Sequence, residues 1–194
     1  MVRGDKFGRK GKPLIKILFV TSWYPNRVHT QDGNFVREYA EAVGAIHPVT
    51  LLHVVEDPAV ATVITERHDR TWGKVIQVCY PGARTRVQRI GSRSRAWQVA
   101  LSEVSAERFD LIHAHVLIDG GIVADSFARR RKIPFVISTH SHRYLEPCPW
   151  LRLPELWLAR RAARRAAFLL PVSPSLQGGM QGHRIRGNYR VLPN

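Results

Sequence analysis

Two closely spaced pairs of histidines are the residues of this chain most suited to chemistry. His113 and His115 lie two residues apart at the end of one apolar run, and His140 and His142 repeat the spacing after the next run. Residues two apart in a strand face the same side, so each pair presents two imidazoles together. Imidazole nitrogens bind Zn²⁺, and they also exchange hydrogen bonds with hydroxyl groups. We expect His113 to be a half-buried strand residue and His115 to be the functional member of its pair.

A metal centre is the less favoured interpretation of these pairs. The carboxylates that complete many catalytic metal sites are scarce nearby, where Asp119 and Glu146 are the only close candidates. The spacing is also common by chance in a chain with nine histidines. We therefore predict no metal and no resident cofactor. A small metal-dependent hydrolase using the four paired histidines stays as a third hypothesis.

Residues 16–43 predict a strand, a loop and a helix that begins near a glycine. An apolar run at 17–20 is followed by a polar, aromatic loop at 21–32, and Gly33 opens a pattern of helical spacing. The free N–H groups at such a helix start can hold an anion, with Asp32 as the expected N-cap and Gly33 allowing close approach of a ligand. The alternative is that Gly33 only makes a tight turn.

Polar side chains follow four of the predicted strands. They are Thr21, Ser22 and Trp23 after the first strand, His115 after 109–114, the segment 139–142, and Ser173 after 168–172. In open α/β sheets, ligands bind in the crevice outside the carboxyl ends of the strands. We expect these residues to meet in one crevice.

The order of apolar runs predicts the architecture. We expect strands at 14–20, 49–55, 74–80, 109–114, 134–139, 168–172 and 189–192, with a further edge strand at 61–65 and a turn at 69–73. Helices are expected at 33–44, 96–108, 119–131 and 156–167, with a mobile loop at 84–95 and a short helix after 173 that ends at Gly178. This is an α/β fold, a single Rossmann-like domain over 13–194 whose mostly parallel sheet has helices on both faces. Residues 1–12 are expected to form a disordered basic tail.

The composition favours an anionic partner and a reducing compartment. The net charge is +15, yet no nucleic-acid-binding motif accompanies it, so nucleic acid is an unlikely ligand. Two cysteines are too few for a disulfide framework. The sequence contains no secretory signal and no apolar run long enough to span a bilayer. We expect a cytoplasmic protein, with peripheral binding at the inner membrane face as a possibility.

The segment 151–168 has two interpretations. Its leucines, Trp157 and Phe168 could lie on one side and its arginines elsewhere, which would suit an anionic membrane surface. The favoured interpretation is an amphipathic helix that packs on the sheet and exposes its arginines.

Six segments of the sequence resemble the amino-terminal domain of glycosyltransferase family 4. They are ILFVTSWYPN (17–26), GNFVREYAEAV (33–43), FDLIHAHVLIDGG (109–121), IPFVISTHSH (133–142), AAFLLPVSPSL (166–176) and VLPN (191–194). Each segment alone is a weak signal, but six in the family's order are a strong one. The resemblance spans residue 14 to the last residue, apart from about 57–95.

The resemblance implies the amino-terminal half of a GT-B fold and a retaining transferase that uses a nucleotide sugar as co-substrate, usually without a metal. It implies that Gly33 and Asn34 lie near the donor diphosphate and that His115 approaches the donor sugar as the catalytic histidine. It also places Trp23, Tyr24, Thr139, His140 and Ser173 on the acceptor side, where a sugar or lipid-linked acceptor would bind.

The same resemblance implies a second domain that these 194 residues do not contain. In the family, that domain carries the nucleotide pocket and further carboxylates. The first hypothesis is therefore an acceptor-side half that needs a donor-binding domain, supplied in trans by a second polypeptide. The alternative is a truncated, non-catalytic Rossmann-like module that binds an anionic ligand or partner.

Overall fold

The computed structural model describes residues 13–145 and 153–193, and these fold around one seven-stranded sheet. Its order is β3-β4-β2-β1-β5-β6-β7, with every neighbouring pair parallel except β3 and β4. The strands are β1 (Ile17–Thr21), β2 (Val49–Glu56), β3 (Ile64–Arg70), β4 (Gly73–Tyr80), β5 (Leu111–His115), β6 (Phe135–Thr139) and β7 (Phe168–Pro171). The helices are α1 (Asn34–Gly44), α2 (Arg86–Glu103), α3 (Ile122–Arg131), α4 (Leu153–Arg165) and α5 (Pro174–Gly182), with short turns η1 (Leu117–Gly121) and η2 (His142–Leu145).

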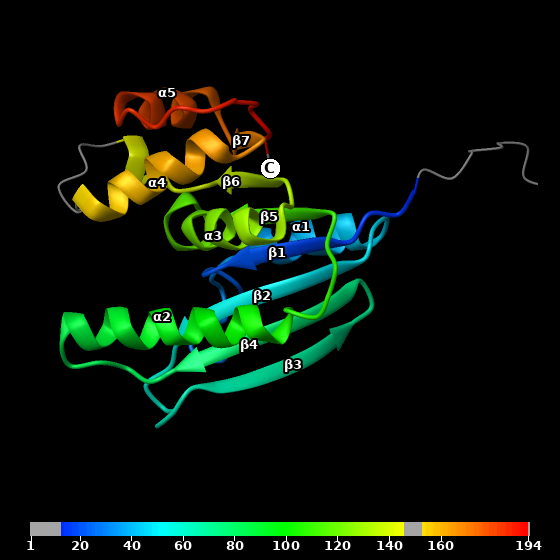
Figure 1. Ribbon diagram of the computed structural model, residues 1–194, viewed down its shortest axis with the longest axis vertical. Coiled ribbons are helices and arrows are strands. Elements are labelled where there is room, and N and C mark those ends of the chain that lie inside the picture. Colours follow the sequence, from blue (N-terminus) through cyan, green and yellow to red (C-terminus); the bar gives the residue numbers. More distant parts are fainter. Residues whose placement is uncertain (1–12, 146–152, 194) are drawn as a thin grey trace, which may run out of the picture.

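Helices cover both faces of the sheet. In Figure 1, α2, α3 and α4 lie in front of the strands and α1 lies behind β1 and β2. Successive residues of β1 serve the two faces in turn: Leu18 and Val20 pack in the core beneath α2 and α3, whereas Ile17 and Phe19 pack beneath α1. A strand buried on both faces needs apolar residues at every position, which explains the unbroken run that marked it in the sequence. The predicted Rossmann-like fold is confirmed.

The strand after β2 runs antiparallel at the edge of the sheet. It was expected at 61–65, but β3 extends over Ile64–Arg70 and pairs with β4 from Ile64 opposite Cys79 to Arg70 opposite Gly73. Its last four residues are exposed and polar, so they lack the apolar pattern that reveals a central strand. The turn at 69–73 is correspondingly shorter, at residues 71–72.

The predicted mobile loop at 84–95 is wrong, because α2 begins ten residues earlier than 96. Thr85 is its N-cap: the Thr85 hydroxyl accepts a hydrogen bond from the Gln88 backbone N–H at 3.3 Å, and the Gln88 side chain accepts one from the Thr85 N–H at 3.2 Å. This reciprocal capping box satisfies two N–H groups at the helix start. Arginine is also a good helix former, so the basic run continues the helix.

Two further predictions at the carboxyl-terminal end need correction. The helix after residue 173 does not end at Gly178, since α5 runs through both glycines to Gly182; Gly179 packs where a larger side chain would collide with the Tyr144 carbonyl. The predicted strand at 189–192 is reduced to a single bridge between Leu169 and Tyr189.

Other boundaries move by a few residues: α3 begins at Ile122, after η1, and α4 begins at Leu153. The expected basic tail at 1–12 and residues 146–152 of the loop before α4 lie outside the described residues. In the part of the chain that the structure describes, no helix combines the length and apolar character needed to cross a lipid bilayer.

Candidate functional site

The carboxyl ends of β1, β5 and β6 bring the predicted site residues to one edge of the sheet. Thr21 pairs with His115 across β1 and β5, and His115 pairs with Ser138 across β5 and β6. Thr139 ends β6 and His140 follows it directly. Parallel pairing in this register therefore places Thr21, His115 and Ser138 side by side, with Thr139 at the next position of β6, so that Thr21, His115 and Thr139 lie at the same end of the sheet.

Three imidazoles stack beneath α1 at this edge. The ring centroids of His113 and His115 are 4.3 Å apart, and those of His115 and His140 are 6.1 Å apart. Helix α1 covers the stack with aromatic rings: Phe35 lies 4.0 Å from His140, and Tyr39 lies 5.8 Å from His115. The stack joins β5, β6 and α1 in one aromatic cluster.

Burial keeps these imidazoles neutral. His115 is fully buried, and burial followed by its neighbours His113 and His140 moves its pKa well below the ordinary value. Burial likewise lowers the pKa of His113 and of His140 to about 4. His113 is more buried than expected, at 8% exposure. A neutral imidazole has one nitrogen that donates and one that accepts, so each ring can serve either function toward a ligand hydroxyl.

Hydrogen-bonding capacity at this edge is left unused. Nε2 of His113 shares a 2.8 Å hydrogen bond with the Ser138 hydroxyl. Among the described residues, by contrast, neither ring nitrogen of His115 or His140 nor the Thr139 hydroxyl has a partner, although all of these atoms are buried. Because an unpaired buried polar group is costly, a concentration of such groups suits a ligand that completes them.

The backbone directly after β5 is strained. Val116, a β-branched residue, has φ 70°, and Asp119 has φ 69°. Gly120 closes the turn: a Cβ atom there would lie 2.5 Å from the His115 carbonyl oxygen and 2.9 Å from that of Val20. Positive φ at residues other than glycine costs free energy and persists only where the surroundings enforce it. The turn therefore holds the end of β5 tightly against β1.

Asp119 in this turn pairs with Arg93 of α2. Its carboxylate lies 2.9 Å from Nη1 of Arg93. Burial raises the pKa of the Asp119 carboxyl, and Arg93 opposes that shift. The pair connects the turn behind His115 to the helix on the front face of the sheet.

The loop from β1 to α1 folds tightly onto the start of the helix. The Thr21 hydroxyl accepts a hydrogen bond from the Trp23 N–H at 3.0 Å. Gly33, with φ 67°, is the N-cap of α1, where any Cβ would collide with the Trp23 backbone. The prediction of Asp32 as N-cap is wrong, and no side chain caps the helix. The Cβ side of Gly33 is thus filled by the chain's own backbone, and the turn requires glycine at this position.

The structure brings Trp23 into the same group of residues but places Tyr24 and Ser173 differently. The Trp23 ring lies 6.3 Å from that of Phe35, next to His140. Tyr24 is 5% exposed and packs in the core near His53, at 5.9 Å between ring centroids. The Ser173 hydroxyl caps α5 by accepting a hydrogen bond from the Leu176 N–H at 3.1 Å.

Sequence reasoning missed a further buried histidine behind this edge. His53 is fully buried in β2, its Nδ1 lies 3.4 Å from the Thr21 carbonyl oxygen, and burial lowers its pKa to about 4. The signal was an ionisable residue in the otherwise uncharged run VTLLHVV. Across the described residues, no group of three or more histidine, cysteine, aspartate or glutamate side chains is arranged to hold a metal ion.

Comparison of the sequence with family models identifies one match. The model of the glycosyl transferase 4-like domain matches residues 28–194. This range includes the three stacked histidines and helix α1, which covers them. No curated protein matches the chain.

Solved structures show where else this fold occurs. Sucrose-phosphate synthase from Thermosynechococcus elongatus superposes with a TM-score of 0.57 and 15% identity, covering 94% of this chain and 89% of that one. The Arabidopsis thaliana protein UGT89C1, solved with UDP, gives a TM-score of 0.55 and 10% identity, covering 94% of this chain and 49% of that one. UDP-GlcNAc 2-epimerase from Methanocaldococcus jannaschii gives a TM-score of 0.54 and 10% identity, covering 93% of this chain and 46% of that one.

The likeness to these structures concerns the fold. At 9–15% identity it carries no residue roles. The chain spans less than half of the length of UGT89C1 and of the epimerase. The same fold also occurs in a sucrose-phosphate synthase and in an epimerase, so the reaction has to be argued from the site itself.

Proposed function

This chain belongs to the glycosyl transferase 4-like domain family, and on that premise we propose that it forms the acceptor-side half of a retaining glycosyltransferase with a nucleotide-sugar donor. The observation that carries the proposal is the unused hydrogen-bonding capacity of His115, His140 and Thr139 at one sheet edge. Sugars present many hydroxyl groups, each of which can donate and accept. Neutral, buried imidazoles suit such a ligand better than they suit an anion, which would prefer a charged partner.

His115 is the proposed catalytic residue. Its uncharged ring would hydrogen-bond a hydroxyl of the donor sugar and fix the sugar while positive charge develops at the anomeric carbon. In the reaction, the bond between that carbon and the diphosphate oxygen breaks, and an acceptor oxygen forms the new bond on the same face. The acceptor hydroxyl passes its proton to the diphosphate oxygen, and the diphosphate leaves with the bonding electrons.

The start of α1 is the proposed support for the departing diphosphate. Gly33 and Asn34 present the first backbone N–H groups of a helix whose cap is not a side chain and whose first turn carries no acidic residue. Such groups stabilise negative charge that develops as the bond breaks. Trp23, Thr139 and His140 would contact the acceptor. Tyr24 and Ser173 would support the acceptor side indirectly, Tyr24 by packing in the core and Ser173 by capping α5.

The complete reaction requires a second lobe that binds the nucleotide. The solved structure of UGT89C1 contains UDP, and this chain corresponds to less than half of that protein. We propose that a donor-binding domain closes over the carboxyl edge of the sheet and that a separate polypeptide can supply it.

Reconstitution tests this proposal. The protein would be mixed with a purified donor domain of the same family, and transfer from radiolabelled UDP-glucose and other nucleotide sugars would be measured. We expect transfer that depends on both polypeptides, that falls by about 10²-fold or more in His115→Ala, and that is unchanged in His68→Ala, which lies on the exposed edge strand. Absence of complex formation and of turnover with every donor domain tried would contradict the proposal.

A binding module without chemistry is the second candidate function. The observation that favours it is the excess of positive charge, +15 for the chain. This alternative predicts that UDP or pyrophosphate raises the midpoint of thermal unfolding while no donor domain restores transfer. Transfer in the reconstituted mixture excludes it.

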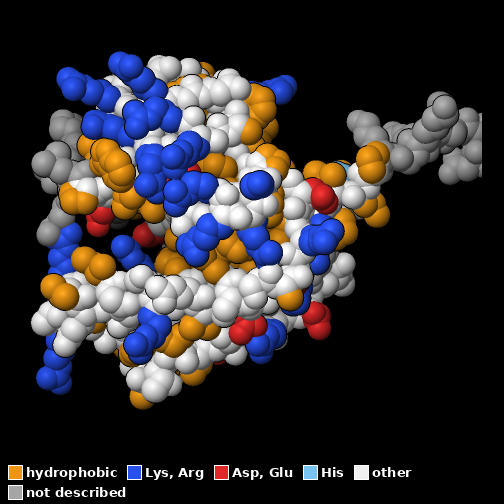
Figure 2. All heavy atoms as spheres, in the orientation of Figure 1, with side chains coloured by type: hydrophobic (Ala, Val, Ile, Leu, Met, Phe, Trp, Pro, Cys, Tyr) orange, Lys and Arg blue, Asp and Glu red, His pale blue; other side chains and the backbone are white. Residues whose placement is uncertain are grey.

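A membrane surface is a further proposed partner, through α4. Trp157 is 57% exposed on this helix, with the Arg161 guanidinium 5.2 Å from its ring, and Figure 2 shows Lys and Arg side chains gathered over the region of α4 and α5. Anionic lipid attracts such a surface, and an exposed tryptophan suits the interface. Co-sedimentation with phosphatidylglycerol vesicles that is lost in Trp157→Ala would support this contact, and equal sedimentation with phosphatidylcholine alone would contradict it.

A further inference from the structure

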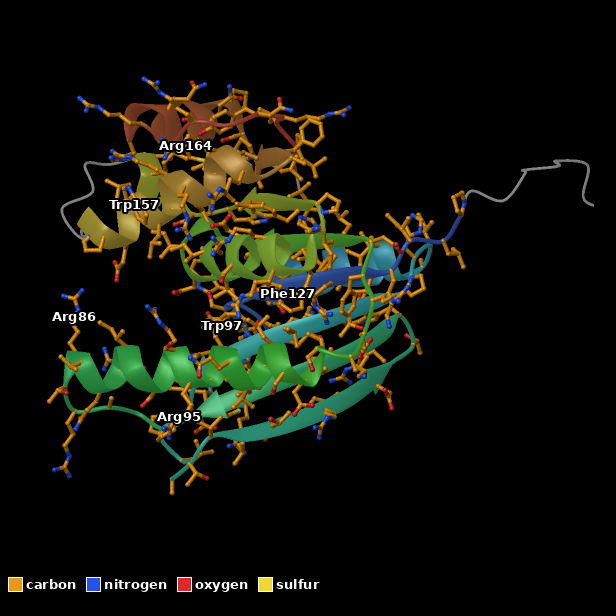
Figure 3. The ribbon with its side chains drawn as sticks, in the orientation of Figure 1. Arg86, Arg95, Trp97, Phe127, Trp157 and Arg164 are labelled. Atoms are coloured by element: carbon orange, nitrogen blue, oxygen red, sulfur yellow. The ribbon has the colours of Figure 1, made fainter. Side chains whose placement is uncertain are left out.

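A cavity between α2 and α4 lies at the carboxyl side of the sheet and is lined mainly by arginines. Its volume is about 340 Å³, and its lining includes Arg84, Arg86, Arg89 and Arg93 of the α2 region, with Glu155 of α4 across from them. Figure 2 shows this part of the surface hollowed between the two helices, and Figure 3 shows Arg86 extending from the start of α2 toward α4. Four cationic side chains thus meet around a space large enough for a small ligand.

Carboxylates from three separate elements hold the arginines in place. Arg89 lies 3.2 Å from Glu56 at the end of β2, and Arg93 lies 2.9 Å from Asp119 in the turn after β5. Arg86 is 3.9 Å from Glu155, which is beyond hydrogen-bond distance. The guanidinium groups of Arg86 and Arg89 are also well exposed, at 40% and 59%. Both can therefore turn donors toward a ligand without breaking a buried ion pair.

The distribution of charge in α2 does not serve helix stability. From Arg84 to Ser102 the sequence contains five arginines and no acidic residue. Cations near the start of a helix oppose its dipole, where acidic side chains are stabilising. The helix forms nevertheless, through the capping box at Thr85. An anion bound among these arginines would offset their unfavourable interaction with the helix dipole at the start of α2.

The cavity is connected to the proposed reaction site. Arg93 contributes to its wall and, through Asp119, contacts the turn that follows His115. The side chain of Ile90, 46% exposed, adds an apolar surface to the same wall, and Val87 is 81% exposed one turn away. An acceptor that lies across the carboxyl edge could thus place one end near His115 and a charged end in the cavity.

We propose that this cavity binds a phosphate group of the acceptor, with Arg86 and Arg89 as its main ligands and Arg93 as the residue that fixes the wall. The proposal rests on the proposed function, because it assigns this face to the acceptor. Guanidinium groups bind phosphate through paired N–H donors, which makes arginine the suitable residue here. A phosphorylated sugar and a phospholipid headgroup share this chemistry, and the experiment separates them.

Binding of defined probes to the full chain tests the site. Isothermal titration with glucose 6-phosphate and with inorganic pyrophosphate would be compared between the natural protein and the double variant R86Q/R89Q. The matched control is R108Q/R130Q, which removes the same charge from two exposed positions, one just before β5 and one on α3, away from both the cavity and α4. We expect R86Q/R89Q to weaken binding by about tenfold or more, since charge-assisted pairs are lost, and the control to change it by less than about twofold.

A second arm identifies the source of the phosphate. Vesicles of phosphatidylcholine with phosphatidic acid would be tested for binding to the same variants. Loss of vesicle binding in R86Q/R89Q but not in the control, without binding of glucose 6-phosphate, assigns the site to a lipid-borne phosphate; the reverse assigns it to a soluble ester. Equal weakening in both double variants, or no phosphate binding by any probe, overturns the site, provided that circular dichroism shows each variant folded.

The outcome is separable from that of the proposed function. If the probes bind as expected but no donor domain restores transfer, the phosphate site stands and the transferase proposal fails. If transfer occurs and R86Q/R89Q leaves the KM for every phosphorylated acceptor unchanged, the transferase proposal stands and the phosphate site fails.

Discussion

Single side chains at the ends of β5 and β6 leave buried hydrogen-bonding capacity unused. His115 is fully buried with both ring nitrogens unpaired among the described residues, whereas His113, two residues earlier, is bonded to Ser138. The sequence predicted His115 as the functional member of the pair. It could not predict the stacking on His140 or the cover from Phe35, because those contacts depend on how α1 crosses the sheet.

Three buried histidines and the half-buried His140 make the free energy of unfolding depend on pH. The pKa values of His53, His113 and His140 are lowered to about 4, and that of His115 is well below its ordinary value. Between about pH 6.5 and pH 4 the unfolded chain binds protons that the folded chain excludes, so stability falls as the pH falls through about 6.5. Each such histidine contributes a slope of up to about 1.4 kcal/mol per pH unit.

Urea denaturation at pH values from 7.5 to 5 checks this expectation. The free energy of unfolding should decrease toward acid, and His53→Gln should reduce the slope because one proton-excluding group is gone. His68→Gln, on the exposed part of β3, should leave the slope unchanged. A flat profile in the natural protein would show that these imidazoles are not held neutral.

Secondary-structure elements differed most from expectation where local capping and close contacts decide their boundaries. Parallel strands were found within a few residues, because a buried strand requires continuous apolar residues. The first ten residues of α2 were missed because they carry arginines in place of an apolar face, and α5 was cut short because its two glycines look like a break. The capping box at Thr85 starts α2, and this short signal was overlooked, whereas the cap of α5 at Ser173 was among the predicted ones.

The glycine at the start of α1 should tolerate no side chain. Gly33→Ala places a Cβ against the Trp23 backbone at a residue with φ 67°, so we expect a loss of about 1–3 kcal/mol in the free energy of unfolding. Gly178→Ala is the matched control, since nothing lies within 4 Å of the added Cβ inside α5 and alanine favours the helix by roughly 1 kcal/mol. Thermal unfolding of both variants gives the comparison, and similar midpoints would contradict the account of the turn.

A buried carboxylate joins α3 to α4. Asp125 is 1% exposed, and one of its oxygens lies 3.0 Å from Nη2 of Arg161 and 3.4 Å from Nη1 of Arg165. We expect Asp125→Asn to cost about 1–3 kcal/mol, because a charge-assisted contact is lost beneath partly exposed arginines. Glu41→Gln, in an exposed pair with Arg37, should cost less than about 0.5 kcal/mol by chemical denaturation. Equal losses of unfolding free energy in the two variants would show that burial does not strengthen the ion pairs of Asp125.

On the scale of the whole molecule, sequence order was enough to predict the sheet and the meeting of its carboxyl ends. The parallel crossovers leave few ways to arrange the strands, so residues that follow separate strands must converge. No pattern in the sequence predicted the cavity between α2 and α4. That cavity joins segments about 70 residues apart in the chain, and it exists only because α2 begins earlier than its apolar residues suggest.

The segment after α5 completes the last edge of the sheet. Ile185 is fully buried, and the backbone around it bonds to β7 through the Asn188 carbonyl and the Arg190 N–H, at 2.8 and 2.9 Å from Leu169. We expect Ile185→Ala to cost about 2–4 kcal/mol in unfolding free energy, as large-to-small changes in a core do. Leu192→Ala, at a residue 40% exposed, should cost under about 1 kcal/mol in the same denaturation experiment. A small effect at Ile185 would mean that the segment is not part of the core.

The antiparallel strand at the other edge also affects how separate molecules meet. β3 presents an unpaired backbone edge, but its exposed residues, Arg67, His68, Asp69 and Arg70, are polar or charged. Hydrated side chains of this kind discourage a neighbouring chain from adding a strand, which is the first step of many forms of aggregation. Replacing them with valine or threonine would let the edge of β3 pair with strands of other molecules and promote filament growth. The distant histidine stack would keep its geometry.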